Sequence, residues 1–262
     1  MFRLLTGGFA LLAATLSAAA EAPPRFGANF TLPAPSVRLI WVAPGTFLMA
    51  GTHGSGDDTE VRITRGYWLG RTEITQEQWQ AVMTNIPLPS LFKGSERPVE
   101  QVSWGSAIIF CQNLTELERA AGRLPPGYIY TLPTEAQWEY ACRAGTTGSY
   151  AGAISALGWY DENSGGETHP VAQKRPNAWG FYDMQGNVAE WCFDWYASYP
   201  GGSVSDPAGP LTGQFRVLRG GAFAGPAGFG RSAMRNWSPT NAGSASIGFR
   251  LALAPTPKPS VH

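Results

Sequence analysis

The sequence predicts an α+β fold, and three observations lead to this prediction. Only three stretches carry helix-start signals, short apolar runs typical of strands lie between Gly and Pro, and long loops are rich in Trp and Tyr. The 262 residues include 32 Gly, 21 Pro and 10 Trp, which indicates much irregular structure held by aromatic anchors. Long loops inside a compact domain usually carry a function or hold an ion.

The first twenty residues have the pattern of a secretory signal peptide. Arg3 is followed by an apolar run from Phe9 to Leu16 and by three alanines, Ala18 to Ala20, at which cleavage is expected. An uncleaved anchor is the alternative, although the run is short for a membrane span. We therefore expect an exported protein, periplasmic or secreted, with no membrane span after cleavage.

The rest of the chain is long enough for one large domain, and no linker divides it. We expect a Pro-rich arm at residues 21–36, the domain at 37–254 and a Pro-rich tail at 255–262. Lys and Arg number 19 and so do Asp and Glu, which gives no reason to expect a nucleic-acid partner.

The three cysteines, Cys111, Cys142 and Cys192, are an odd number for an oxidising compartment. One disulfide plus a buried thiol and three buried thiols are both compatible with the sequence. Their spacing matches no zinc pattern.

The N-terminal part of the domain predicts strands followed by a helix. Residues 37–49 indicate two short strands around Pro44-Gly45, and residues 61–70 indicate another. Thr75 and Gln78 then form a capping box, which predicts a helix that runs through Met83.

Two further helices are predicted before the pattern changes. Ser103 begins one, with a buried stripe at helical spacing, and Gly122 ends it. The members of the stripe are Ala107, Phe110, Cys111 and Leu114. Thr134 and Gln137 form a second capping box and begin a short helix with Trp138, Ala141 and Cys142 on one face. Beyond Gly145 we expect strands and loops, with strands within 216–221 and 248–253.

The stretch Asn177–Tyr196, NAWGFYDMQGNVAEWCFDWY, has four oxygen-bearing side chains among its rings: Asp183, Asn187, Glu190 and Asp194. One interpretation makes Gly186-Asn187 a turn between aromatic-rich strands, with the carboxylates facing solvent. The other has carboxylates and turn carbonyls around a hard cation, because Ca²⁺ accepts six to eight oxygen ligands of mixed type.

Seven motifs in order resemble the formylglycine-generating enzyme (sulfatase-modifying factor) family. The resemblance covers Val37 to Leu253 and implies the family's variant of the C-type-lectin fold, with few short helices and short strands. The motifs are PGTFLM (Pro44 to Met49), TEITQEQW (Thr72 to Trp79), RPVEQVSW (Arg97 to Trp104), TLPTEAQWEYACRAGT (Thr131 to Thr146), NAWGFYDMQGNVAEW (Asn177 to Trp191), RVLRGG (Arg216 to Gly221) and GFRLAL (Gly248 to Leu253).

The resemblance also implies structural calcium. By the family's pattern, the side chains of Asp183 and Glu190 and the carbonyls of Gly186 and Val188 would bind the ion. A second family site would begin at Asn163 and Ser164, and the shorter loop that follows leaves its later ligands unassigned.

The family's catalytic residues are missing. Its oxidases bind copper with two cysteines, and soft Cu(I) requires such thiolates. Gly225 and Gly230 occupy those positions, and Ala222 and Ala189 replace a serine and a tryptophan found in the oxidases. We expect no copper, assign no catalytic residue and exclude formylglycine formation by the copper-thiolate route.

The segment that forms the substrate groove in relatives offers Arg231, Ser232, Arg235, Asn236 and Trp237. Arginine can pair with a carboxylate and tryptophan can stack on a ligand. The alternative is that the arginines pair with nearby acids and Trp237 packs in the core.

Two functions follow from these features. The first is a calcium-stabilised binding or scaffold protein of the cell envelope that recognises a peptide, protein or glycan. The second is a divergent oxidoreductase that acts on a peptide or peptide-derived metabolite. An exported relative that matures the pyoverdine siderophore chromophore also lacks the cysteine pair, which keeps the enzymatic alternative open.

Overall fold

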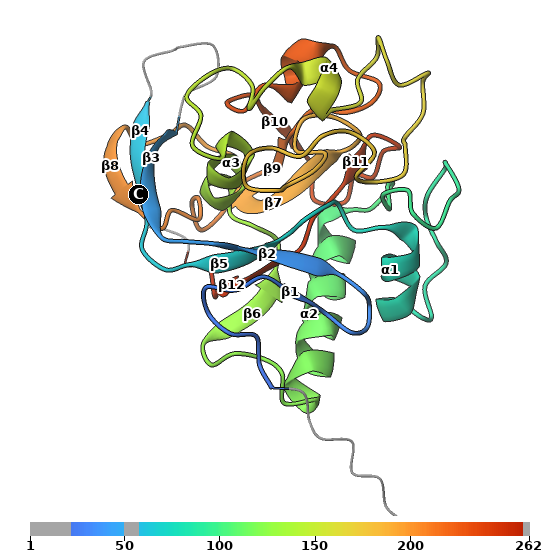
Figure 1. The fold of residues 1–262 in the computed structure, drawn as a ribbon, viewed down its shortest axis with the longest axis vertical. Coiled ribbons are helices and arrows are strands. Elements are labelled where there is room, and N and C mark those ends of the chain that lie inside the picture. The colour runs from blue at the N-terminus through green and yellow to red at the C-terminus, as the bar shows by residue number, and fades with distance from the viewer. Residues whose placement is uncertain (1–21, 50–57, 259–262) are drawn as a thin grey trace, which may run out of the picture.

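The computed structural model describes residues 22–49 and 58–258, so the predicted signal peptide at residues 1–20 lies outside the described residues. The α+β class is confirmed (Figure 1). The helices are α1 (Gln76–Val82), α2 (Trp104–Ala120), α3 (Glu135–Arg143) and α4 (Ile154–Leu157). None of the helices in these residues is long and apolar enough to cross a membrane.

The strands form three sheets. The central antiparallel sheet has the order β1 (Phe30–Thr31), β2 (Arg38–Val42), β5 (Tyr67–Gly70), β12 (Ala252–Pro255) and β6 (Tyr128–Thr131). A second sheet has the order β10 (Arg235–Ser238), β9 (Arg216–Arg219), β7 (Ala189–Trp195) and β11 (Ile247–Gly248). The third has the order β3 (Gly45–Met49), β4 (Thr59–Ile63) and β8 (Gly202–Ser205).

Both predicted capping boxes are confirmed. At α1 the Thr75 hydroxyl accepts a hydrogen bond from the Gln78 amide, and the Gln78 side chain accepts one from the Thr75 amide. Thr134 and Gln137 make the same pair at α3, with distances of 3.0 and 3.2 Å. Each box satisfies amide groups that have no partner within the helix, which is why these short helices begin where they do.

Helix α2 begins after Ser103 and is followed by Gly122 at a φ of +73°, as predicted. Its predicted stripe is buried, and the Phe110 ring stacks on Trp79 of α1 at 5.8 Å.

The central sheet separates two apolar clusters, because successive side chains of a strand point to opposite faces. Leu39, Trp68 and Leu253 lie in the cluster with α1 and α2. Ile40, Leu69 and Ala252 lie in the cluster with α3, β3 and β4. Figure 1 shows α1 and α2 below and to the right, with α3 and the second sheet above.

Two predicted single strands are in fact pairs of strands. Residues 61–70 contain the end of β4 and all of β5, which lie in different sheets. The break falls at Gly66, where a Cβ atom would lie 2.1 Å from the Trp41 ring. Residues 248–253 contain the end of β11 and the start of β12, separated by the buried Arg250.

The Pro-rich segment expected as an arm packs on the domain. Its strand β1 pairs with β2, and Leu32 is 1% exposed in the core. Phe26 contacts the Trp41 and Trp68 rings at 5.9 and 5.3 Å.

Candidate functional site

The segment that would hold the oxidase cysteines follows β9. Gly220 and Gly221 have φ angles of +96° and +70°, which favour glycine, and the chain then passes through the 3-10 helix η2 (Ala227–Gly230). A Cβ atom at Gly225 would lie 3.3 Å from the Phe229 ring. At Gly230 it would lie 3.2 Å from Ile154. Glycine at both positions therefore lets the segment pack closely on its surroundings.

A small cavity lies beside this segment. It has a volume of about 20 Å³ and is lined by Ala189, Gly221, Phe229, Met234 and Asn236, among others. That volume suits one water molecule. The two positions of the oxidase cysteines therefore offer no thiol.

The five residues predicted to line a groove do not form one site. Ser232 is fully buried, with its hydroxyl 3.3 Å from the Gln185 amide nitrogen and 3.6 Å from the Cys142 sulfur. Arg231, Asn236 and Trp237 are exposed, and the Trp237 ring lies 4.7 Å from Tyr196. The alternative of core packing is thus wrong for Trp237, whose side chain is 48% exposed.

Arg235 pairs with an acid instead. Its guanidinium donates to both carboxylate oxygens of Glu135, at 2.7 and 2.8 Å, and lies 3.9 Å from the centre of the Tyr199 ring. The Tyr199 hydroxyl donates to the same carboxylate at 3.0 Å. For Arg235 the ion-pair interpretation is confirmed.

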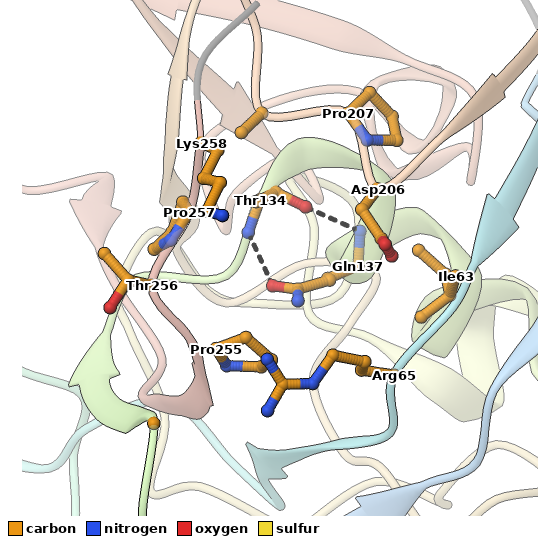
Figure 2. Close-up of a pocket in the computed structure, with 12 residues that line it drawn as sticks. Ile63, Arg65, Thr134, Gln137, Asp206, Pro207, Pro255, Thr256, Pro257 and Lys258 are labelled. Carbon is orange, nitrogen blue, oxygen red and sulfur yellow. Dashed lines mark hydrogen bonds between the residues drawn. The ribbon is translucent and has the colours of Figure 1, made fainter.

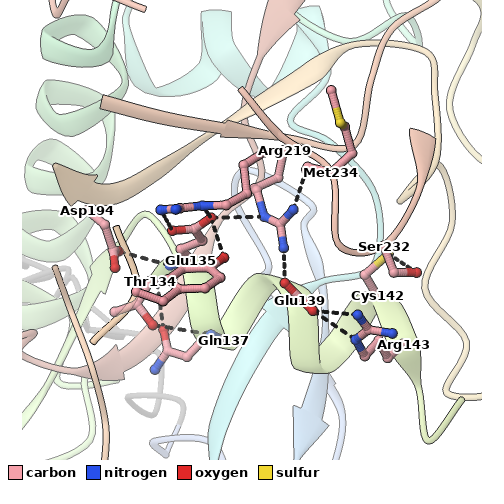
Figure 3. A network of polar contacts seen from close by, with 12 residues as sticks. Thr134, Glu135, Gln137, Glu139, Cys142, Arg143, Asp194, Arg219, Ser232 and Met234 are labelled. Carbon is pink, nitrogen blue, oxygen red and sulfur yellow. Dashed lines mark hydrogen bonds and ion pairs between the residues drawn. The ribbon is translucent and has the colours of Figure 1, made fainter. Parts of the chain in front are cut away.

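A buried ion network extends from this pair (Figure 3). Arg219 reaches Glu135 at 3.4 Å, and it also bonds Glu139 and the carbonyl of Met234. Arg143 donates to Glu139 at 2.8 Å. Burial alone would raise the pKa of Glu135, but Arg235 and Arg219 hold it below its ordinary value. Burial raises the pKa of Glu139 despite its two arginines.

A cavity of about 480 Å³ borders this network. Glu135, Asp194, Tyr199 and Arg235 lie on one side, and Val61 is among the apolar residues that line it. Asp194 accepts a hydrogen bond from the Glu135 amide at 2.9 Å. Burial, together with the nearby Glu135 carboxylate, raises the pKa of Asp194 to about 8. The cavity therefore combines an apolar wall with a proton-holding carboxyl group.

The stretch Asn177–Tyr196 is buried throughout its polar positions. Asp183, Asn187, Glu190 and Asp194 are each at most 4% exposed. The idea that these carboxylates face solvent is therefore wrong. The hairpin is also wrong, because β7 begins just after the turn whereas residues 158–188 contain no strand. Asp183 and Asn187 have φ angles of +55° and +61°, so this turn is built from unusual backbone.

Glu190, a predicted calcium ligand, has other partners in the structure. Arg250 donates to both of its oxygens at 2.6 Å, and the Trp138 indole donates to one at 2.8 Å. Glu73, which the sequence analysis missed, accepts hydrogen bonds from the Asn187 side chain and the Val188 amide. Burial, with the nearby Asp183 and Glu190 carboxylates, raises the pKa of Glu73 well above its ordinary value.

Among the three neighbouring carboxylates Glu73, Asp183 and Glu190, Asp183 is the one best able to bind a cation. Its Oδ2 accepts from the Ala172 amide at 2.7 Å, whereas its buried Oδ1 has no donor among the described residues. Burial raises the pKa of Asp183 to about 6. Among residues 22–49 and 58–258, no group of three or more Asp, Glu, His or Cys side chains is arranged to hold a metal. A calcium ion here would thus depend on Asp183 and on carbonyls such as those of Gly186 and Val188, and it stays a prediction.

The residues of the predicted second site are held by hydrogen bonds of their own. In the turn that contains Asn163 and Ser164, the Asn163 side chain accepts from the Tyr160 amide at 2.8 Å. The Ser164 hydroxyl donates to the Phe223 carbonyl at 2.9 Å. The segment just before this turn lies against the turn of the first site, because the Asn187 amide donates to the Trp159 carbonyl at 2.8 Å. These bonds hold the loop without an ion, and calcium at Asn163 and Ser164 also stays a prediction.

All three cysteines are buried and free, so the alternative of three thiols agrees with the structure. Burial raises the pKa of Cys142 to about 12 and that of Cys192 well above its usual value. Such thiols are poor nucleophiles and poor metal ligands, because both roles require the thiolate.

Two buried ion networks are thus present, one around Glu135 and Glu139 and one in which Arg250 faces Glu73, Asp183 and Glu190. Of their members, the sequence singled out Arg235, Asp183 and Glu190 for a possible site and missed the others. The pairs lie far apart in the chain, as for Arg219 with Glu139 and Arg250 with Glu190. The one local signal was the spacing of Glu135, Glu139 and Arg143, which places all three on one face of a helix.

Comparison with known proteins identifies the family. Residues 27–255 match the family described as "Sulfatase-modifying factor enzyme 1-like domain". The chain belongs to this family. Within it, the chain is 30% identical to "Chaperone protein LppX" of Paenibacillus barcinonensis, over 71% of this chain and 78% of that protein. It is 35% identical to the formylglycine-generating enzyme of Streptomyces coelicolor, over 59% of this chain and 52% of the enzyme, so it spans about half of that relative.

A solved structure supports the fold. Treponema denticola variable protein 1 superposes with a TM-score of 0.77 and 32% identity, covering 87% of this chain and 99% of that one. Proteins similar to this chain thus include a formylglycine-generating enzyme, a protein named as a chaperone and a protein named as variable.

Proposed function

We propose that this sulfatase-modifying factor family member is an exported binding or scaffold protein of the cell envelope, with calcium as a structural ion. The observation that carries the proposal is the loss of the oxidase's cysteine pair. Gly225 and Gly230 stand at those positions, and both pack closely against neighbouring side chains. A chain that kept the oxidase chemistry would need thiolates there.

The recognition surface in this proposal is the segment Ala222–Ser246. It presents Arg231, Asn236 and Trp237 to solvent, and Phe229 is 43% exposed nearby in the sequence. Exposed aromatic and arginine side chains are the residue types that dominate binding energy at interfaces. The similarity to a protein named as a chaperone supports binding of a polypeptide by analogy.

The test begins with residues 21–262, purified without added metal and screened against a peptide library and a glycan array. Trp237→Ala should weaken the binding of any selected ligand by about tenfold or more, since exposed anchors of this kind contribute most to affinity. Leu117→Ala is the matched control, because Leu117 is 52% exposed on α2 and lies outside the segment.

Metal analysis separates binding from catalysis. The parent should take up no stoichiometric Cu(I), whereas a Gly225→Cys, Gly230→Cys double variant supplies the two thiols and should gain Cu(I) binding. Copper or iron near one per chain in the parent, with oxygen consumption on a peptide and no ligand in either screen, would overturn the proposal in favour of a divergent oxidoreductase.

A further inference from the structure

A second large cavity, of about 330 Å³, lies at the start of α3 and shares no lining residue with the segment Ala222–Ser246 (Figure 2). The turn between β4 and β5, the loop after β8 and the end of the described chain form its walls. Ile63, Ala208 and three prolines supply apolar surface: Pro207, Pro255 and Pro257. Neither the family comparison nor the proposed function assigns this cavity a role.

Two cations line the cavity without an anionic partner. Arg65 and Lys258 are both exposed and form no ion pair with any described residue. The Arg65 guanidinium lies over the Tyr128 ring at 5.1 Å, which holds it at the rim. The one carboxylate of the lining, Asp206, accepts hydrogen bonds from the amide and the hydroxyl of Thr64.

A third donor comes from a buried side chain. Gln137 is 9% exposed, and its Oε1 is fixed by the Thr134 amide in the capping box of α3. The Oε1 contact turns the other half of the amide group, Nε2, toward the cavity (Figure 2). Gln137 can therefore donate to a ligand in the cavity while its Oε1 still accepts from the Thr134 amide.

We propose that this cavity binds an oxyanion carried on a small apolar body, with Arg65, Lys258 and Gln137 as its donors. A planar guanidinium can donate two parallel hydrogen bonds to a carboxylate, sulfate or phosphate group, and the ammonium adds a point charge. The proline and isoleucine side chains contact the body of the ligand. The cavity is larger than an oxyanion alone, which is why the apolar part belongs to the proposal.

The probes are acetate, benzoate, inorganic sulfate and inorganic phosphate, titrated calorimetrically into residues 21–262 at low ionic strength. We expect benzoate to bind more tightly than acetate if the group recognised is a carboxylate. Tighter binding of sulfate or phosphate than of benzoate would overturn the apolar part and identify a sulfate or phosphate group. Failure of all four probes to bind would overturn the whole proposal.

Variants assign the binding to these donors. Gln137→Glu keeps an oxygen for the Thr134 amide, so the helix stays capped, and it replaces the Nε2 donor by a carboxylate oxygen. We expect this variant and Arg65→Gln each to weaken binding by about tenfold or more, as for loss of a charge-assisted hydrogen bond. Arg119→Gln, on the exposed face of α2, should bind as the parent does. Equal weakening in Arg119→Gln would overturn the site, because it would reveal a general charge effect.

Discussion

Two buried ion networks lie within this domain, and they are built with opposite charge balance. Around Glu135 and Glu139, three arginines meet two carboxylates, and every carboxylate oxygen is held by a donor: the arginines are Arg143, Arg219 and Arg235. Around Arg250, a single arginine meets three carboxylates: Glu73, Asp183 and Glu190.

The two networks differ in how well their carboxylates are satisfied. In the arginine-rich network every oxygen of Glu135 and Glu139 has a donor, and the unsatisfied atom is Arg219 Nε, which lies 3.4 Å from Glu135 without a hydrogen bond. In the acidic network, the pKa values of Glu73 and Asp183 are raised, and Asp183 Oδ1 has no donor. Excess buried negative charge is stabilised either by protons or by a bound cation. The resemblance implies calcium at the network that has excess negative charge, and a bound cation would neutralise that charge.

The largest expected effect comes from breaking the arginine-rich network at its centre. Arg219→Met should lower the free energy of unfolding by about 3–5 kcal/mol, because Glu135 and Glu139 would stay buried with one arginine each. Urea denaturation measures the change. Arg119→Met, which removes an exposed pair with Glu116, should cost at most about 1 kcal/mol. Equal costs for the two variants would show that the buried network contributes no more than a surface pair.

The acidic network supplies the second prediction, in which calcium stabilises the parent. At a calcium concentration of 100 times the dissociation constant, the gain is about 2.7 kcal/mol, which corresponds to several degrees in the melting temperature. Asp183→Asn should remove this gain while changing the chelated protein little, since an amide oxygen can still accept from Ala172. Glu190→Ala should also remove it, and should in addition lower the stability of the chelated protein because Arg250 loses its partner.

Thermal melting with calcium and with a chelator distinguishes these outcomes. A melting temperature of the parent that is the same in both would eliminate calcium from this domain. If calcium still raised the melting temperature of Asp183→Asn, the ion would bind elsewhere, such as at the turn that contains Asn163 and Ser164.

Local signals predicted much of the fold. The capping boxes at Thr75 and Thr134 and the stripe on α2 depend on residues within one or two helical turns, and each was confirmed. The split of residues 61–70 into two strands was missed, because it depends on the Trp41 ring packing against Gly66 from another strand. Local sequence cannot show such a contact.

The candidate site was less predictable for the same reason. The sequence indicated only that Arg219 belongs to a short strand, because its partner Glu139 is 80 residues away on α3. Arg250 read as a strand residue in GFRLAL, although its side chain carries the charge of the acidic network. The emptied oxidase position was predictable from sequence alone, because it depends on the identity of two residues and not on their partners.

The last prediction concerns Asp194, which adds a third carboxyl group beside the arginine-rich network. Its pKa is raised from 3.8 to about 8, so between these values the folded protein holds a proton that the unfolded chain has lost. Stability from this group is therefore full below about pH 4, falls as the pH rises toward 8 and changes no further above it.

Asp194→Asn stays neutral, and its oxygen can still accept from the Glu135 amide. The stability of the variant relative to the parent should rise steadily from pH 4 to pH 8, and at pH 8.5 the variant should be the more stable of the two. Glu73 and Asp183 titrate in both proteins, so the difference between the two pH curves isolates Asp194. Exposed Asp161→Asn controls for the loss of one negative charge. If the variant were the less stable at pH 8.5, Asp194 would be ionised in the folded protein and would complete the charge balance of the three arginines, which would make the first network as dependent on ionisation as the second.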